Sequence, residues 1–184
     1  KILVSDAQIV NIANTANNVT SNYTITYVSG DLTIKSVKAQ SVTVTGYNNI
    51  YDGADHTITT GTTTEGTIVY STNQTNWSTT KPTQTVAGTT KVYVKVSGDK
   101  NHTDSDITSG DIKITKKSIT ITANEQTVDY GTEITKNVSQ VTVATLATGD
   151  SLTSITLTQS GENAGSGKII PSVAEIKDGT NTVV

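Results

Sequence analysis

The residues of this chain that could carry acid–base chemistry are few. His56 and His102 are the two histidines, and there is no cysteine. A serine–histidine–acid set can be drawn from any chain this rich in Ser and Asp, so these residue types alone are poor evidence for a hydrolase. No nucleophile-elbow sequence lies near either histidine, and the lack of cysteine excludes thiolate chemistry and disulfides. We therefore expect no catalytic residues, no cofactor and no enzyme activity.

One acidic stretch could bind a metal ion. Asp104 and Asp106 flank a serine, and Asp99 lies five residues before them. Three carboxylates that converge between two strands could bind Ca²⁺, a hard cation that takes several oxygen ligands. The stretch lacks the glycine turn and the distal glutamate of an EF-hand loop, so we favour a solvated loop. If a metal site existed in this chain, Asp99, Asp104 and Asp106 would be its candidate ligands, but we expect none.

Trp77 is the single tryptophan of the chain, in the stretch NQTNWSTT. Sugar-binding modules use such a ring as a stacking platform, and Asn73 and Asn76 would be its polar neighbours. The competing interpretation is that Trp77 covers one end of a β core near Val69 or Pro82. In a chain with so few aromatic side chains, packing is the better use of the ring, and we favour it.

A cross-link between lysine and asparagine is a further alternative. Some cysteine-free surface domains form a Lys–Asn amide beside a buried acid. Lysine and asparagine are plentiful here, but the sequence does not show which of them are buried. We do not expect the cross-link, and the intact mass tests it through the loss of ammonia.

Alternation of apolar and polar residues is the main structural signal. In TKVYVKV at Thr90–Val96, three valines lie on one face and two lysines and a tyrosine on the other. The same pattern marks Ser41–Thr45, His56–Thr60, Thr67–Ser71, Asp111–Thr115, Ser118–Thr122, Val141–Thr145 and Ser154–Thr158. Only Ser172–Lys177 is expected to form a short helical turn. Short alternating strands at roughly ten-residue spacing, separated by Gly and Asp turns, predict an all-β fold of antiparallel sandwich modules.

Composition agrees with this class and excludes several functions. Threonine makes up about a fifth of the chain, and Thr, Val and Ile suit a half-buried pleated surface. The net charge is −3, with 13 basic and 16 acidic residues and no basic block, so we expect no nucleic-acid partner. No apolar run approaches the roughly 18 residues of a membrane span, and we expect no membrane insertion. With no signal-peptide pattern at Lys1, the chain is expected to be cytosolic, already processed or excised from a longer protein.

Two ends of the chain resemble each other. KIIPSVAEIKDGTNTVV at residues 168–184 aligns without a gap on KILVSDAQIVNIANTAN at residues 1–17, with seven of seventeen positions identical. A second, weaker similarity relates SVTVTGYNNIYDG at residues 41–53 to SITITANEQTVDYG at residues 118–131. We therefore predict three parts: residues 1–36 as the C-terminal half of one module, 37–116 as a complete module, and 117–184 as the N-terminal part of another.

These segments also resemble known bacterial repeats. NYTITYVSGDLTIK (residues 22–35) and ITITANEQTVDYGTEI (residues 119–134) resemble the end and the beginning of an MBG-type surface repeat. NNIYDGADHTITT and TIVYSTNQTNWSTTKPT, in the middle part, resemble an immunoglobulin-like domain of the YDG type. The resemblance implies tandem immunoglobulin-like β-sandwiches in an extracellular, surface-anchored or secreted bacterial protein. It implies a structural spacer in an adhesin-like stalk; the alternative is a carbohydrate- or host-ligand-binding module centred on Trp77.

The two incomplete parts are expected to associate. SNYTITYVSGDLTI (residues 21–34) reads as a strand, a Ser-Gly-Asp turn and a closing strand, and residues 117–184 lack such a closing hairpin. An open sheet edge is a template for pairing, and the module between them would hold the two halves some 35–45 Å apart at about 3.3 Å per residue. We expect this segment of one molecule to complete residues 117–184 of another, in a swapped dimer or a head-to-tail fibre. The side chains that would take part are Tyr23, Ile25, Tyr27, Leu32 and Ile34.

Overall fold

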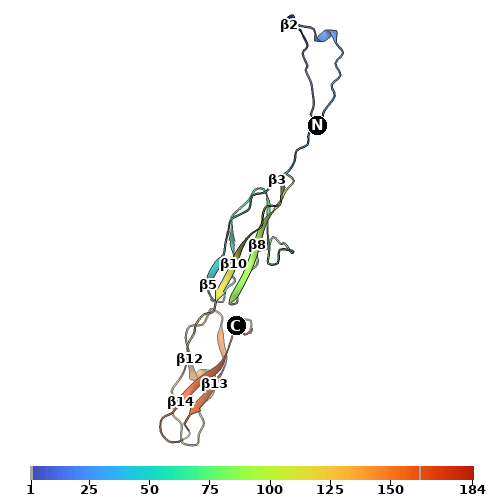
Figure 1. The fold of residues 1–184 in the computed structure, drawn as a ribbon. Helices are drawn as coiled ribbons and strands as arrows, with labels where there is room; N and C mark the ends of the chain where they lie inside the picture. The colour runs from blue at the N-terminus through green and yellow to red at the C-terminus, as the bar shows by residue number, and fades with distance from the viewer. Residues whose placement is uncertain (1, 162) are drawn as a thin grey trace. The chain divides into compact units, whose positions relative to one another are not determined.

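The chain is nearly all β, as predicted. The computed structural model describes residues 2–161 and 163–184 (Figure 1). Within these residues the helical segments are two short 3-10 turns, neither long nor apolar enough to cross a membrane. The chain divides into two compact units, Lys1–Val37 and Lys38–Val184. Following the boundary that the sequence predicts, we call residues 38–116 of the second unit the central module and residues 117–184 the C-terminal module.

A four-stranded sheet of order β5-β10-β8-β7 forms the framework of the central module (Figure 1). Its strands are β5 (Tyr47–Ile50), β7 (Gly66–Ser71), β8 (Gly88–Gly98) and β10 (Thr108–Thr115). Strand β8 pairs antiparallel with β7 and β10, but β5 pairs parallel with β10. The expectation of a wholly antiparallel arrangement is therefore wrong at this edge. The chain from β6 to β9 separates β5 from β10, and so long a connection permits a parallel pair.

Four short strands complete the elements of this region: β3 (Val37–Lys38), β4 (Val44–Thr45), β6 (Thr59–Thr60) and β9 (His102–Thr103). Strand β4 pairs antiparallel with β6. Both are shorter than the alternating segments at 41–45 and 56–60 predicted, because only their last residues form ladder pairs.

The core of the central module lies on one face of the four-stranded sheet. Val92, Val94 and Val96 of β8 are fully buried, while Lys91, the residue before Val92, is exposed. The alternation in TKVYVKV is thus confirmed, because successive side chains of a strand point to opposite faces. The remaining members of the buried cluster are Ala39, Val42, Ile58, Tyr70 and Ile112. Three of these, at 39, 42 and 58, come from outside the sheet and cover its apolar face.

The C-terminal module is built from two antiparallel pairs with a thin core. Strand β11 (Ile121–Ala123) pairs with β12 (Val141–Val143), and β13 (Ser151–Ser160) with β14 (Lys168–Lys177). A 3-10 turn, η2 (Val138–Gln140), precedes β12. The buried apolar side chains of this module are Ile134, Ala147 and Leu157.

The predicted helical turn at Ser172–Lys177 is wrong, because this segment is the second half of β14. Its side chains meet β13 across the sheet, with Ser172 opposite Thr156 and Ile176 opposite Leu152. Pairing with a long neighbouring strand outweighs the weak local preference for a turn.

The first unit contains the hairpin of β1 (Val10–Asn11) and β2 (Asn14–Asn18), followed by the 3-10 turn η1 (Thr20–Asn22). The strand–turn–strand hairpin expected at residues 21–34 is not formed. Among residues 2–161 and 163–184, its ladder contact is an isolated bridge between Gly30 and Ile2. None of residues 2–37 is buried. A hairpin with no sheet to pack against is marginal in water, which explains the missing strands.

The aligned segments 1–17 and 168–184 share two backbone features at positions 167 residues apart. Asp6 and Val173 both have a positive φ, at 54° and 46°. Residues other than glycine rarely adopt this backbone conformation. The side-chain oxygen of Asn11 accepts the N–H two residues on at 2.8 Å, and that of Asp178 does the same at 2.9 Å. The two segments therefore place a kink and a turn at the same positions.

Candidate functional site

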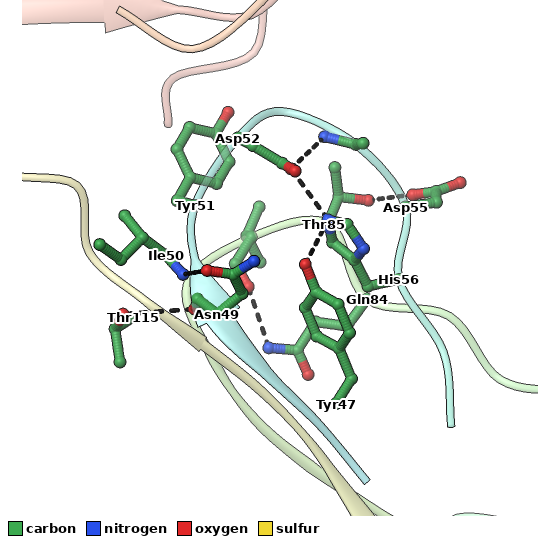
Figure 2. Close-up of polar contacts among 12 residues, drawn as sticks. Tyr47, Asn49, Ile50, Tyr51, Asp52, Asp55, His56, Gln84, Thr85 and Thr115 are labelled. Atoms are coloured by element: carbon green, nitrogen blue, oxygen red, sulfur yellow. Dashed lines mark hydrogen bonds and ion pairs between the residues drawn. The ribbon is translucent and has the colours of Figure 1, made fainter. Parts of the chain in front are cut away.

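The loop that joins β5 to β6 carries a cluster of polar contacts (Figure 2). The His56 ring stacks on Tyr47, with centroids 4.1 Å apart and planes 10° apart. Its Nε2 lies 2.9 Å from Asp52 Oδ1 and 3.2 Å from the Tyr47 hydroxyl. A carboxylate only accepts hydrogen bonds, so Nε2 carries a hydrogen and its N–H donates a hydrogen bond to Asp52.

Asp52 fixes the turn in which it lies. The N–H of Ala54 donates to the same carboxylate oxygen at 2.9 Å, and Gly53 has a φ of +85°. An aspartate followed by a glycine is a typical turn sequence, and in the structure Asp52 caps its own turn while Gly53 takes the positive φ. The hydrogen bond from His56, together with that from Ala54, lowers the pKa of Asp52, because both stabilise the charged form.

A neighbouring segment holds the far side of this loop. His56 and Gln84 exchange backbone hydrogen bonds of 3.0 and 2.9 Å. The hydroxyl of Thr85 donates to Asp55, and that of Thr57 donates to a backbone carbonyl at 2.6 Å. Figure 2 shows Thr85 pointing toward Asp55 of the 51–56 loop. The loop is therefore held from two sides, which limits its freedom.

The tip of the loop contacts the C-terminal module. The hydroxyl of Tyr51 donates to Asp150 Oδ1 at 3.2 Å. Partial burial and the Asp150 carboxylate raise the pKa of Tyr51, because both disfavour the phenolate. A Cβ built on Gly53 would lie 2.7 Å from the carbonyl oxygen of Thr148. No side chain fits there, so Gly53 permits the backbones of the two modules to approach each other.

A cavity of about 220 Å³ lies at the same contact. Its lining comes from both modules and from the Lys116–Lys117 junction, and is mostly apolar: Tyr51, Val86, Ala87, Lys116, Lys117, Ile119, Leu146, Ala147, Asp150, Ile176 and Val184. The ammonium group of Lys117 donates to the carbonyl oxygen of Leu146 at 3.2 Å. We call the Tyr51–Gly53 tip, Thr148, Asp150 and this cavity the module joint.

The histidines are used for structure. The ring of His56 bonds Tyr47 and Asp52, and the ring of His102 bonds Asp99 at 2.8 Å. Among the described hydrogen bonds, neither ring contacts a serine or threonine hydroxyl, so the pairing that activates a nucleophile is not assembled.

The three candidate metal-binding aspartates face different partners. Asp99 accepts from its own turn and from His102, and Asp106 pairs with Lys38 at 2.6 Å. Asp104 pairs with Lys95 at 2.6 Å, and this bond, with one from a backbone N–H, lowers its pKa. Residues 2–161 and 163–184 contain no group of three His, Asp or Glu placed to hold a metal ion.

Trp77 is half-buried on the outer face of β8. The ammonium of Lys95 lies 4.8 Å from the centre of its ring, within cation–π range. Its Nε1–H donates to the carbonyl of Gln74 at 3.2 Å. Trp77 is not among the residues that pack on the buried core cluster. Lys95, over which it lies, is paired with Val69 of β7, and the packing of Trp77 near Val69 or Pro82 stays a prediction. The alternation of β8 directs Lys95 away from the buried valines, but the sequence did not indicate that Trp77 would lie over it.

Asn73, one of the expected polar neighbours of Trp77, takes part in the local turn. The carboxamide oxygen of Asn73 accepts from the backbone N–H groups of Thr75 and Asn76, at 3.0 and 2.9 Å. It therefore serves the turn. The exposed side chain of Asn76 has no described contact with the ring.

No described lysine is buried. A spontaneous Lys–Asn cross-link needs an apolar environment that keeps the amine neutral, and residues 2–161 and 163–184 give no lysine this environment.

Searches of protein-family models, of curated proteins and of solved structures each found no match to this chain. The resemblance to MBG-type and YDG-type repeats therefore remains a prediction from the motifs.

Proposed function

We propose that this chain is a non-catalytic spacer, a segment of an extracellular bacterial adhesin-like stalk made of tandem immunoglobulin-like β-sandwich modules. The module joint is the observation that carries the proposal. A spacer that transmits position needs neighbouring modules held in a fixed relation, and the joint provides a hydrogen bond, a close backbone approach and an apolar contact at one place.

The YDG motif gains a role under this proposal. Tyr51 reaches the next module, Asp52 fixes the turn, and Gly53 allows the approach to Thr148. The three residue types suit these roles: the long tyrosine side chain brings its hydroxyl to the next module, the carboxylate accepts backbone N–H groups of the turn, and glycine tolerates a positive φ. The motif therefore serves as the docking loop of its module.

The tandem arrangement is supported by the matched segments at the two ends of the chain. They share identities, a kink at Asp6 and Val173, and a turn at Asn11 and Asp178. A bacterial surface location is proposed from the resemblance alone.

The rigidity of the joint can be measured by electron–electron distance spectroscopy. Spin labels attached through Lys113→Cys and Gln159→Cys lie on exposed sites of the two modules, and the chain has no other cysteine. We expect a single narrow distance distribution. Gly53→Val should broaden it, because a side chain at residue 53 would overlap the Thr148 carbonyl.

Gly131→Val is the matched control. Gly131 also has a positive φ, +81° against +85° for Gly53, but a Cβ there would meet nothing within 4 Å. Both substitutions cost about 1–2 kcal/mol of backbone strain, and only the one at Gly53 reaches the joint. A broad distance distribution in the doubly labelled chain that keeps Gly53 would refute the stiff spacer.

Sugar binding is the outcome that would replace this proposal. Nothing in the Trp77 surroundings favours it, since Lys95 covers one face of the ring. A glycan array that retains a ligand, and loses it with Trp77→Ala, would establish a binding module.

A further inference from the structure

The segment that leads into the central module lies along the strand that leads out of it. The ammonium of Lys38 pairs with Asp106 at 2.6 Å, and the hydroxyl of Ser41 donates to the carbonyl oxygen of Asp106 at 3.0 Å. The hydroxyl of Thr108, the first residue of β10, donates to the carbonyl oxygen of Val42 at 3.4 Å. The two segments therefore advance in the same direction from the same end of the module.

Glycines allow the two segments to come close together. A Cβ on Gly110 would lie 2.8 Å from Cγ1 of Val44, and a Cβ on Gly46 would lie 2.7 Å from the carbonyl oxygen of Asp111. The first contact is with a side chain that can turn away. The second is with backbone, which cannot yield without displacing β10, so Gly46 is the position at which a glycine is required.

Beyond Gly46 the contact becomes a parallel ladder. The four residues of β5 pair with residues 112–115 of β10. The N–H of Tyr51 donates to the carbonyl oxygen of Thr115 at 2.8 Å, and the hydroxyl of Thr115 donates to the carbonyl oxygen of Asn49 at 3.2 Å (Figure 2). The entering segment thus follows β10 from its first residue to its last.

Tension along the chain would load this pair of strands in shear. It would draw Lys38 away from the first residue of β10 and draw Lys116, the residue after β10, in the opposite direction. The hydrogen bonds of a parallel ladder are evenly spaced, so they would share the load and break together. Strand β10 is also held at its other edge, where residues 108–114 pair antiparallel with β8 (Figure 1).

We infer that β5 and β10 form a mechanical clamp, so that the central module resists force along the chain better than force that separates its strands sideways. Forced unfolding is governed by the unfolding rate and not by the equilibrium stability, so the direction of the load matters. The inference rests on the proposed function for its purpose, since a spacer in a stalk is loaded along its chain. The clamp itself lies within the central module.

Pulling single molecules of the full chain with optical tweezers compares two directions of load. For axial load, DNA handles are attached through Ser36→Cys and Ser118→Cys, at exposed residues that flank the central module. The chain has no other cysteine. Unfolding of the module between these handles should lengthen the tether by roughly 250 Å, at about 3.5 Å per residue.

The control load acts on the same module from another direction. Its handles are attached through Thr64→Cys and Lys100→Cys, at exposed residues just beyond the paired ends of β7 and β8. Force applied there opens the β7–β8 ladder one residue pair at a time. At equal loading rate we expect the axial unfolding force to be at least about twofold higher, because several backbone hydrogen bonds must break together. Equal forces, or a lower axial force, overturn the inference.

Gly46→Val tests the clamp at its closest approach. A side chain at residue 46 would push β5 away from the Asp111 carbonyl, so the axial force should fall by a larger factor than the control force. An equal fall in both forces contradicts the clamp. If this variant does not fold, the comparison of the two load directions decides alone.

The clamp and the proposed spacer can fail separately. Equal unfolding forces together with narrow spin-label distances would remove the clamp and leave the spacer. A high axial force together with broad spin-label distances would leave the clamp and remove the stiff spacer.

Discussion

Asp52 shows how one exposed carboxylate can organise a functional loop. It accepts from the ring of His56 and from the backbone of Ala54, and so orients the tip that carries Tyr51 and Gly53. The sequence predicted the turn, because an aspartate before a glycine is a strong local signal. It did not predict His56 as a partner of Asp52. That contact depends on where β5 ends and on the stacking of His56 against the ring of Tyr47.

The charge state of Asp52 can be followed directly. Its pKa lies below the 3.8 of a free aspartate, chiefly because His56 donates to it. The stabilisation is therefore present above pH 3.8 and is lost as the pH falls through the lower, folded value. We expect carbon-detected NMR titration to give a midpoint below 3.8.

Substitution of the donor tests the cause. His56→Phe keeps an aromatic ring against Tyr47 and removes the N–H, so the pKa of Asp52 should rise toward 3.8. Asp99, whose pKa is lowered by Asn101 and His102, serves as the control and should not change. An unchanged midpoint at Asp52 would mean that the backbone N–H of Ala54 alone sets it.

At the level of the elements, strands with one buried face were predictable and the others were not. The valines of β8 alternate with polar residues, so the sequence predicted both the strand and its inner face. Strand β5 (YNNI) has no such alternation, and its parallel pairing with β10 arises from the tertiary fold. The segment at 21–34 alternates well, yet forms no strand, because a strand also needs a neighbour with free backbone groups.

The inner face of the sheet should dominate the stability of the central module. Ile112 of β10 is fully buried in the core cluster, so Ile112→Ala should lower the free energy of unfolding by about 2–5 kcal/mol. The next residue, Lys113, is exposed, and Lys113→Ala should change it by less than about 0.5 kcal/mol.

Urea unfolding measured by tryptophan fluorescence is suited to this comparison. Trp77 is the single tryptophan and lies in the central module, so its emission reports the unfolding of that module alone. Equal effects of the two substitutions would mean that the core does not lie on the Ile112 face.

For the whole molecule, the two compact units should differ strongly in local stability. The central module has a continuous buried cluster, and the first unit has no buried residue between 2 and 37. Amides that open only with a cooperative core exchange slowly, and those in exposed segments exchange quickly.

Hydrogen exchange of the dilute chain should reflect this difference. We expect the amides of β8 and β10 to exchange at least about a thousandfold more slowly than those of residues 2–37, because their opening requires unfolding of the core. Slow exchange throughout residues 2–37 in a dilute, monomeric sample would show that the first unit has a stable core of its own.

The sequence by itself determined the class of the protein, the inner face of its main strands, the turn at Asp52, and the correspondence between residues 1–17 and 168–184. These features depend on local residue types and on the alternation of apolar and polar residues along a strand, and both can be read directly from one sequence. Tertiary structure alone decided the parallel edge at β5, the position of Lys95 over Trp77, the separation of the three aspartates and the contact of the YDG loop with Asp150. Each of these is set by residues distant in sequence, whose meeting depends on how the strands pair and on which backbone groups remain free to bond.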